Sequence, residues 1–163
     1  MHNRIMTIVV VILALAGHGL EVKAGNDPDR YVKKHQYPAG QILVVAEGEF
    51  EPRSIGSYSI RMYSNAQGEY PTDDYVCGII RPRDGVVEDV LFADLDQDGT
   101  KEIVVTIRSV GTGSYLSADA FKFDGKDLSL VATVSDLPRD ADCVAALKDR
   151  IRKSPNKPLD STP

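Results

Sequence analysis

Apolar and polar residues alternate in short runs along most of the chain, a pattern typical of β-strands. Residues 57–63 show it clearly, with Tyr58, Ile60 and Met62 on one side of the predicted strand. Residues 103–107 are apolar except for Thr106 and rich in β-branched side chains, which predicts a buried strand with a turn-rich loop at each end. The other predicted strands cover residues 41–51, 76–80, 86–93, 115–123 and 128–134.

The apolar spacing becomes helical in the last part of this region. Val144, Leu147 and Ile151 predict one short helix within residues 141–153, with Asp140 or Asp142 available as its N-cap. Short strands followed by one helix predict a mainly β fold, an antiparallel β-sandwich or barrel-like domain with a short C-terminal helix.

The two ends of the chain differ in composition from a single β-rich domain expected over residues 41–153. Residues 1–24 contain an early arginine, an apolar run too short to span a bilayer and a terminal Val-Lys-Ala, which predicts a cleaved signal peptide. Polar residues 25–40 predict an irregular lead-in, and proline-rich residues 154–163 predict a flexible tail. We therefore expect an exported protein without a membrane attachment after cleavage.

The chain is acidic, with a formal net charge of −5. Residues 1–24 hold two basic residues and one acidic residue, so 17 basic and 23 acidic residues remain and the mature charge is about −6. This balance argues against a nucleic-acid partner, which requires a basic surface. It suits a cationic partner.

Cys77 and Cys143 form an even pair in a chain with an export signal, which predicts a disulfide between the third strand and the helix. Closing a loop of that length would contribute roughly 4 kcal/mol in the chain-entropy model. The alternative is a pair of buried free thiols.

Candidate catalytic groups are few. Glu47, Glu49 and Glu51 alternate on one predicted strand face, and we interpret them as a solvated face rather than an acid–base pair. After residue 24 the only histidine is His35, and no nucleophile elbow or phosphate-binding loop is present. The sequence therefore predicts that the protein is not an enzyme and requires no cofactor.

An acidic turn precedes the buried strand. Asp94, Asp96, Asp98 and Gly99 match the start of a calcium loop, but position twelve is Val105 instead of the glutamate of an EF-hand. One interpretation is a shorter calcium-binding hairpin, in which Asp94, Asp96, Asp98 and Glu102 hold a structural ion. The alternative is a tight turn in which the aspartates accept hydrogen bonds from their own backbone.

A glycine-rich loop follows the same strand, with the sequence Val110-Gly111-Thr112-Gly113-Ser114-Tyr115. Glycines allow tight backbone conformations, and a loop on a rigid scaffold often carries recognition residues. From the residues alone, a plain hairpin connection with Tyr115 turned into the core is equally open.

Three segments together, residues 47–58, 94–99 and 108–118, resemble the bacterial periplasmic inhibitors of invertebrate-type (i-type) lysozyme. The resemblance extends over residues 41–134. It implies a periplasmic protein that inserts a protruding Ser-Gly-x-Tyr loop into the lysozyme cleft. The corresponding residues are Thr112, Gly113, Ser114 and Tyr115, so that threonine replaces the first serine.

The resemblance also implies a mechanism and partners. Hydroxyl groups of the loop would bond the two catalytic carboxyl groups that glycoside hydrolysis requires. Supporting residues would be Arg108, Ser109, Gly111 and Tyr58. The partner would be an i-type lysozyme, and a homodimer is compatible with the resemblance. The alternative function is a calcium-stabilised module that binds carbohydrate or peptidoglycan.

Overall fold

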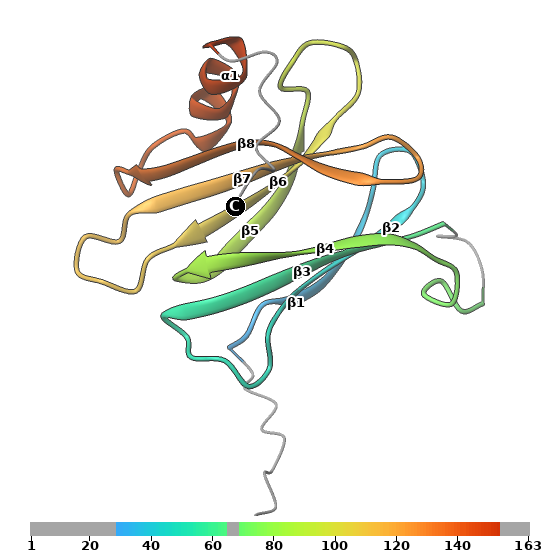
Figure 1. Cartoon of the computed structure of the whole chain (residues 1–163), viewed down its shortest axis with the longest axis horizontal. Coiled ribbons are helices and arrows are strands. Elements are labelled where there is room, and N and C mark those ends of the chain that lie inside the picture. Colours follow the sequence, from blue (N-terminus) through green and yellow to red (C-terminus); the bar gives the residue numbers. More distant parts are fainter. Residues whose placement is uncertain (1–28, 65–68, 154–163) are drawn as a thin grey trace, which may run out of the picture.

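The computed structural model describes residues 29–64 and 69–153, which form two four-stranded antiparallel sheets and one helix (Figure 1). Each sheet is a simple meander, with strand order β1-β2-β3-β4 in one and β5-β6-β7-β8 in the other. The predicted mainly β fold with one short C-terminal helix is confirmed. The elements are β1 (Val32–Gln36), β2 (Ile42–Glu47), β3 (Ile55–Tyr63), β4 (Tyr75–Asp84), β5 (Val86–Ala93), β6 (Glu102–Arg108), β7 (Leu116–Phe123), β8 (Leu128–Leu137) and α1 (Cys143–Lys153).

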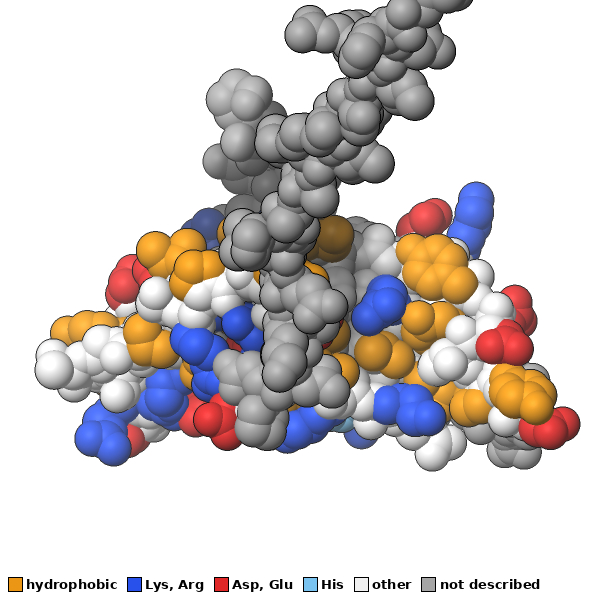
Figure 2. Space-filling view, turned by 90° about the horizontal axis from the view of Figure 1, so that it is seen from below, with side chains coloured by type: hydrophobic (Ala, Val, Ile, Leu, Met, Phe, Trp, Pro, Cys, Tyr) orange, Lys and Arg blue, Asp and Glu red, His pale blue; other side chains and the backbone are white. Residues whose placement is uncertain are grey.

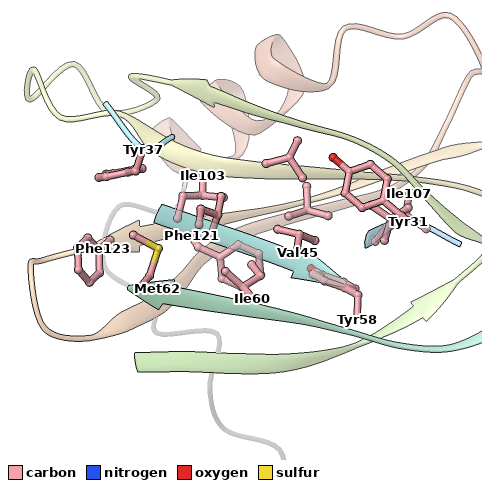
Figure 3. Close-up of a cluster of buried hydrophobic side chains, with 14 residues drawn as sticks. Tyr31, Tyr37, Val45, Tyr58, Ile60, Met62, Ile103, Ile107, Phe121 and Phe123 are labelled. Atoms are coloured by element: carbon pink, nitrogen blue, oxygen red, sulfur yellow. The ribbon is translucent and has the colours of Figure 1, made fainter. Parts of the chain in front are cut away.

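The main hydrophobic core lies between the two sheets (Figure 3). Alternate residues of β3 face it, and Tyr58, Ile60 and Met62 are completely buried, as the alternating pattern predicts. From the opposite sheet, β6 contributes Ile103 and β7 contributes Phe121, both also fully buried. The tightly filled interior fixes the register of both sheets and therefore the positions of the loops at their ends.

A second core lies between the outer face of the β5–β8 sheet and helix α1. Leu147 of the helix is fully buried there, against Ala118 and Ala120 of β7. The backbone N–H of Ala145 donates to Asp142 Oδ1 at 3.0 Å, so Asp142 is the helix N-cap. Both sides of β6 are consequently covered, which explains its continuous apolar sequence.

The lead-in predicted as irregular contains a strand, so that prediction was wrong over residues 32–36. Strand β1 pairs with β2 at the edge of its sheet, and most of its side chains are exposed, which removes the apolar alternation. Tyr31 and Tyr37, on either side of the strand, are buried and anchor it to the main core.

The third predicted strand was too short, because β4 continues through Pro82 to Asp84. Strand β4 pairs only with β3, so it is an edge strand whose proline need not donate a ladder hydrogen bond.

The prediction that three glutamates share one solvated strand face was also wrong, although Glu49 is exposed. Strand β2 ends at Glu47, which is buried and accepts a hydrogen bond from the Val87 N–H at 2.6 Å. Because Val87 belongs to β5, this bond connects the two sheets, and Glu47 Oε1 also lies 3.9 Å from Nε of Arg83 in a buried ion pair within the first sheet. Glu51 instead lies in the following turn, where it accepts the Ser57 hydroxyl at 2.7 Å.

The predicted disulfide is absent, and both cysteines are free thiols. Cys77 of β4 packs against the core between the sheets, whereas Cys143 lies in the core beneath helix α1. The β5–β8 sheet separates these two cores, so the thiols cannot meet without rearranging it. The alternative of free, largely buried thiols is therefore the correct one.

The first sheet forms the face seen in Figure 2, where apolar side chains lie among lysines and arginines. Its exposed apolar residues include Tyr75 and Ile80 of β4. No helix in residues 29–64 and 69–153 is long and apolar enough to cross a membrane. The predicted signal peptide and flexible tail lie outside these ranges.

Candidate functional site

The glycine-rich loop joins the end of β6 to the start of β7 and projects from one end of the sandwich (Figure 1). Residues 110–113 are exposed, and Tyr115 keeps 53% of its surface accessible. The alternative in which Tyr115 enters the core is therefore wrong. Both flanking strands are buried, so the loop is an exposed element on a rigid support.

Backbone hydrogen bonds fix the shape of this loop. The N–H of Ser109 donates to the carbonyl of Tyr115 at 2.9 Å, which closes the base of the loop. The N–H of Ser114 donates to the carbonyl of Gly111 at 3.0 Å and forms a tight turn inside it. Ser114 has a φ of 44°, a left-handed conformation that non-glycine residues seldom adopt. The bonds that surround it hold this conformation in place.

The ring of Tyr115 lies directly over Gly113. A Cβ atom added to Gly113 would be only 2.3 Å from Cε2 of that ring. Gly113 therefore permits the close approach of the tyrosine ring, which a side chain at this position would displace. By contrast, a Cβ atom on Gly111 would meet nothing within 4 Å.

Arg108, at the end of β6, braces the loop from the side. Its Nε and one terminal nitrogen donate to the two carboxylate oxygens of Glu88 at 2.8 and 2.9 Å, a bidentate pair. Its other terminal nitrogen donates to the Ser114 carbonyl at 3.0 Å. The Glu88 carboxylate raises the pKa of the guanidinium, which stays charged.

Glu88 is a residue that the sequence pattern does not reveal. It belongs to β5 and reaches Arg108 because the pairing of β5 with β6 shifts register between Val87 and Asp89. Such a bulge has no signature here, since the residues around it form an ordinary strand pattern.

The other predicted supporting residues divide into two groups. Ser109 and Gly111 take part in the backbone bonds of the loop, as described above. Tyr58 is completely buried in the main core, where its hydroxyl donates to Asp119 Oδ2 at 2.6 Å. Burial raises the pKa of Tyr58, which stays protonated. Tyr58 therefore supports the scaffold and is inaccessible to a partner.

A second loop, residues 48–54, lies at the same end of the sandwich and is held by the buried Arg83. The guanidinium of Arg83 donates to the carbonyls of Pro52 and Arg53 at 3.0 and 2.8 Å. It also donates to the carbonyl of Gly85. Gly85 in turn packs against the backbone of Arg108, because a Cβ atom added to Gly85 would lie 2.2 Å from the Arg108 carbonyl oxygen. The two loops are thus connected through the β4–β5 turn.

The acidic turn lies at the opposite end of β6. Asp94 accepts the N–H groups of Gln97 and Gly99 at 2.7 and 3.1 Å, and Asp98 accepts that of Thr100 at 2.7 Å. These are the local backbone bonds that the tight-turn alternative predicts. Carboxylate oxygens of Asp94, Asp96 and Glu102 also lie within 4.8 Å of one another.

Lys122 of β7 supplies a positive charge to this turn, which the sequence reasoning missed. Its ammonium lies 3.0 Å from Asp96 Oδ2 and also contacts Asp98. These carboxylates raise the pKa of Lys122, and its ammonium lowers the pKa of Asp98. The residue is far from the turn in sequence and is brought there only by the pairing of β6 with β7.

Comparison with known proteins identifies the family. The sequence model of the periplasmic lysozyme inhibitors of I-type lysozyme matches residues 29–151. The chain belongs to this family. Its members inhibit an enzyme and are not enzymes themselves, and their description as periplasmic agrees with the predicted export. The comparison with curated proteins gave no match.

Two solved structures of this inhibitor family resemble the chain closely. The crystal structure of PliI-Ah from Aeromonas hydrophila is 39% identical, with a TM-score of 0.68 over 72% of this chain and 98% of that chain. The structure of Aeromonas hydrophila PliI in complex with Meretrix lusoria lysozyme is 40% identical, with the same TM-score over 72% of this chain and 95% of that chain. Family membership therefore makes this chain a lysozyme inhibitor of the same fold.

Proposed function

We propose that this protein inhibits i-type lysozyme by inserting the loop Thr112-Gly113-Ser114-Tyr115 into the active-site cleft, where it contacts the catalytic carboxyl groups. The observation that carries the proposal is the exposed and braced geometry of this loop, with Tyr115 at its end. A loop without a glycosidic bond can occupy the cleft of a glycoside hydrolase without being cleaved.

The hydroxyl groups of the loop provide the polar contacts. Thr112 is exposed, and its hydroxyl matches the serine hydroxyl that the resemblance places at this position. A hydrogen bond from a hydroxyl to a charged carboxylate contributes roughly 1.5–3 kcal/mol. Tyr115 adds a rigid aromatic ring whose ordering on binding costs little entropy, as in other interface anchors.

Preorganisation of the loop strengthens this contact. The bonds from Arg108 and Ser109 fix the backbone before any partner arrives. A loop held in its bound shape avoids the entropy that a flexible segment loses on binding. The bidentate pair of Arg108 with Glu88 therefore belongs to the inhibitory apparatus as a positioning contact.

The surface around the loop supplies apolar area at the same end of the sandwich. Val110 in the loop, Ile55 at the start of β3 and Phe50 in the neighbouring loop keep 55%, 66% and 70% of their surfaces exposed. We assign them to the rim of the lysozyme contact. The negative charge of the mature chain, about −6, would speed its encounter with a cationic lysozyme.

The test is a turbidity assay of cell-wall lysis with i-type, c-type and g-type lysozymes, each titrated with the purified protein. We expect inhibition of the i-type enzyme at a lower inhibitor concentration than for either other class. Equal inhibition of all three classes would contradict the assignment to i-type lysozyme. Binding to purified peptidoglycan without inhibition of any lysozyme would support the alternative carbohydrate-binding function instead.

A further inference from the structure

The acidic turn at the far end of β6 contains more negative charge than its own lysine compensates. Its carboxylates come from Asp94, Asp96, Asp98 and Glu102, at the first, third, fifth and ninth positions of the turn. The ammonium of Lys122 is the one cation that the ion pairs of the described residues bring to this group. Three of the four carboxylate charges are therefore left without a counter-charge.

Glu102 is the residue that points to a missing ligand. Its side chain is only 1% exposed, and its Oε2 accepts the Leu95 N–H at 2.8 Å. Its Oε1 is buried and has no hydrogen-bond partner. The nearest cation, Lys122 Nζ, is 3.9 Å from this oxygen, beyond hydrogen-bond distance. A buried carboxylate oxygen without a partner is costly, so such an atom is normally satisfied by a proton, a water molecule or a cation.

The spacing of the oxygens fits a metal ion. Oxygens bound to calcium lie 2.3–2.6 Å from the ion, so two of them are at most about 5 Å apart. Carboxylate oxygens of Asp94, Asp96 and Glu102 meet this limit, since all lie within 4.8 Å of one another. Asp94 and Asp96 follow the end of β5 and Glu102 begins β6, so a shared ion would join the two sides of the turn.

Lys122 leaves this position open. Its hydrogen bonds go to Asp96 and Asp98, and its side chain is 33% exposed. The oxygens of Asp94 and the free oxygen of Glu102 are the ones it does not bond.

We infer that this turn binds a divalent cation of the calcium class through Asp94, Asp96 and Glu102, with Asp98 in reach as a further ligand. Hard carboxylate oxygens that do not form a strict octahedron suit calcium better than magnesium, which demands one. The ion would tie the turn to the base of β6 and to Leu95, which is buried beneath helix α1. Its role is structural, because the turn and the inhibitory loop lie at opposite ends of β6.

Chelator-treated protein provides the test, through calcium titration calorimetry and thermal melting with and without calcium. We expect saturable binding in or below the millimolar range typical of exported modules, and a higher melting temperature in calcium. Terbium offers a spectroscopic probe, because the Tyr37 hydroxyl donates to the carbonyl of Lys101, next to Glu102, and can sensitise its luminescence.

Three variants make the result specific. Asp94→Asn should lose the melting shift and the terbium signal, whereas Asp124→Asn, in another exposed acidic turn outside this cluster, should keep both. Lys122→Gln removes the positive charge that would repel a nearby cation and should bind calcium more tightly. The inference is overturned if neither the wild type nor Lys122→Gln shows a calcium-dependent heat or melting shift, or if Asp94→Asn behaves like Asp124→Asn.

Discussion

At the scale of single residues, the shape of the proposed inhibitory loop depends on a contact between a glycine and a tyrosine. The Tyr115 ring occupies the space where any side chain at position 113 would begin. The sequence identified both residues through a family resemblance, but the reason for the glycine is visible only in the structure. Gly113 is needed for a close approach, whereas its neighbour Gly111 has open space around its Cα.

This difference gives a matched pair of variants. Gly113→Ala would place its Cβ in contact with the exposed Tyr115 ring and displace it, so we expect inhibition of i-type lysozyme to weaken by about tenfold. Gly111→Ala adds the same methyl group in open space and should inhibit like the wild type. Both should melt within a few degrees of the wild type, since neither touches the core. Inhibition constants that are equal for the two variants would contradict the proposed role of the tyrosine position.

At the scale of secondary-structure elements, local patterns predicted the strands that face a core on at least one side. The alternation in β3 and the apolar run in β6 are such cases. The pattern failed where tertiary context decides. Strand β1 has exposed side chains at an edge, and Glu47 is buried only because Arg83 and Val87 come from other strands to meet it.

The cysteines illustrate the same limit. Their even number and the export signal predicted a disulfide, but pairing depends on which face of a sheet each thiol occupies. Cys77 and Cys143 lie in different cores on opposite faces of the β5–β8 sheet. The face of the sheet on which each cysteine lies cannot be deduced from the spacing of the cysteines in the sequence.

Free thiols predict that a reductant has no effect on folding. We expect dithiothreitol to leave the melting temperature unchanged, and thiol titration of the unfolded, unreduced protein to find both cysteines reactive. In the folded protein both thiols should react slowly, because burial raises the pKa of each. A disulfide closing this loop would contribute roughly 4 kcal/mol, so a loss of several degrees on reduction would contradict the free-thiol structure.

At the scale of the whole molecule, strand β6 connects two sites with different chemistry. One end carries the braced loop with Tyr115, and the other carries the acidic turn with Glu102 and Lys122. The sequence located both loops and the fold class. It did not reveal Glu88 or Lys122, since each reaches its site from another strand through register alone. A homodimer stays a prediction.

The proposed inhibitory loop is an exposed element, so its role can be tested by substitutions that leave the core unchanged. Tyr115 and Tyr70 are both exposed, at 53% and 65%, but Tyr70 lies in the β3–β4 connection at the opposite end of the sandwich. Tyr70→Ala is therefore a control for loss of an exposed aromatic ring.

The most direct measurement is the inhibition constant of each alanine variant against an i-type lysozyme. We predict that Tyr115→Ala weakens inhibition by at least about tenfold and that Tyr70→Ala remains within about twofold of the wild type. If Tyr115→Ala inhibits as strongly as the wild type, the Thr112–Tyr115 loop is not the inhibitory element.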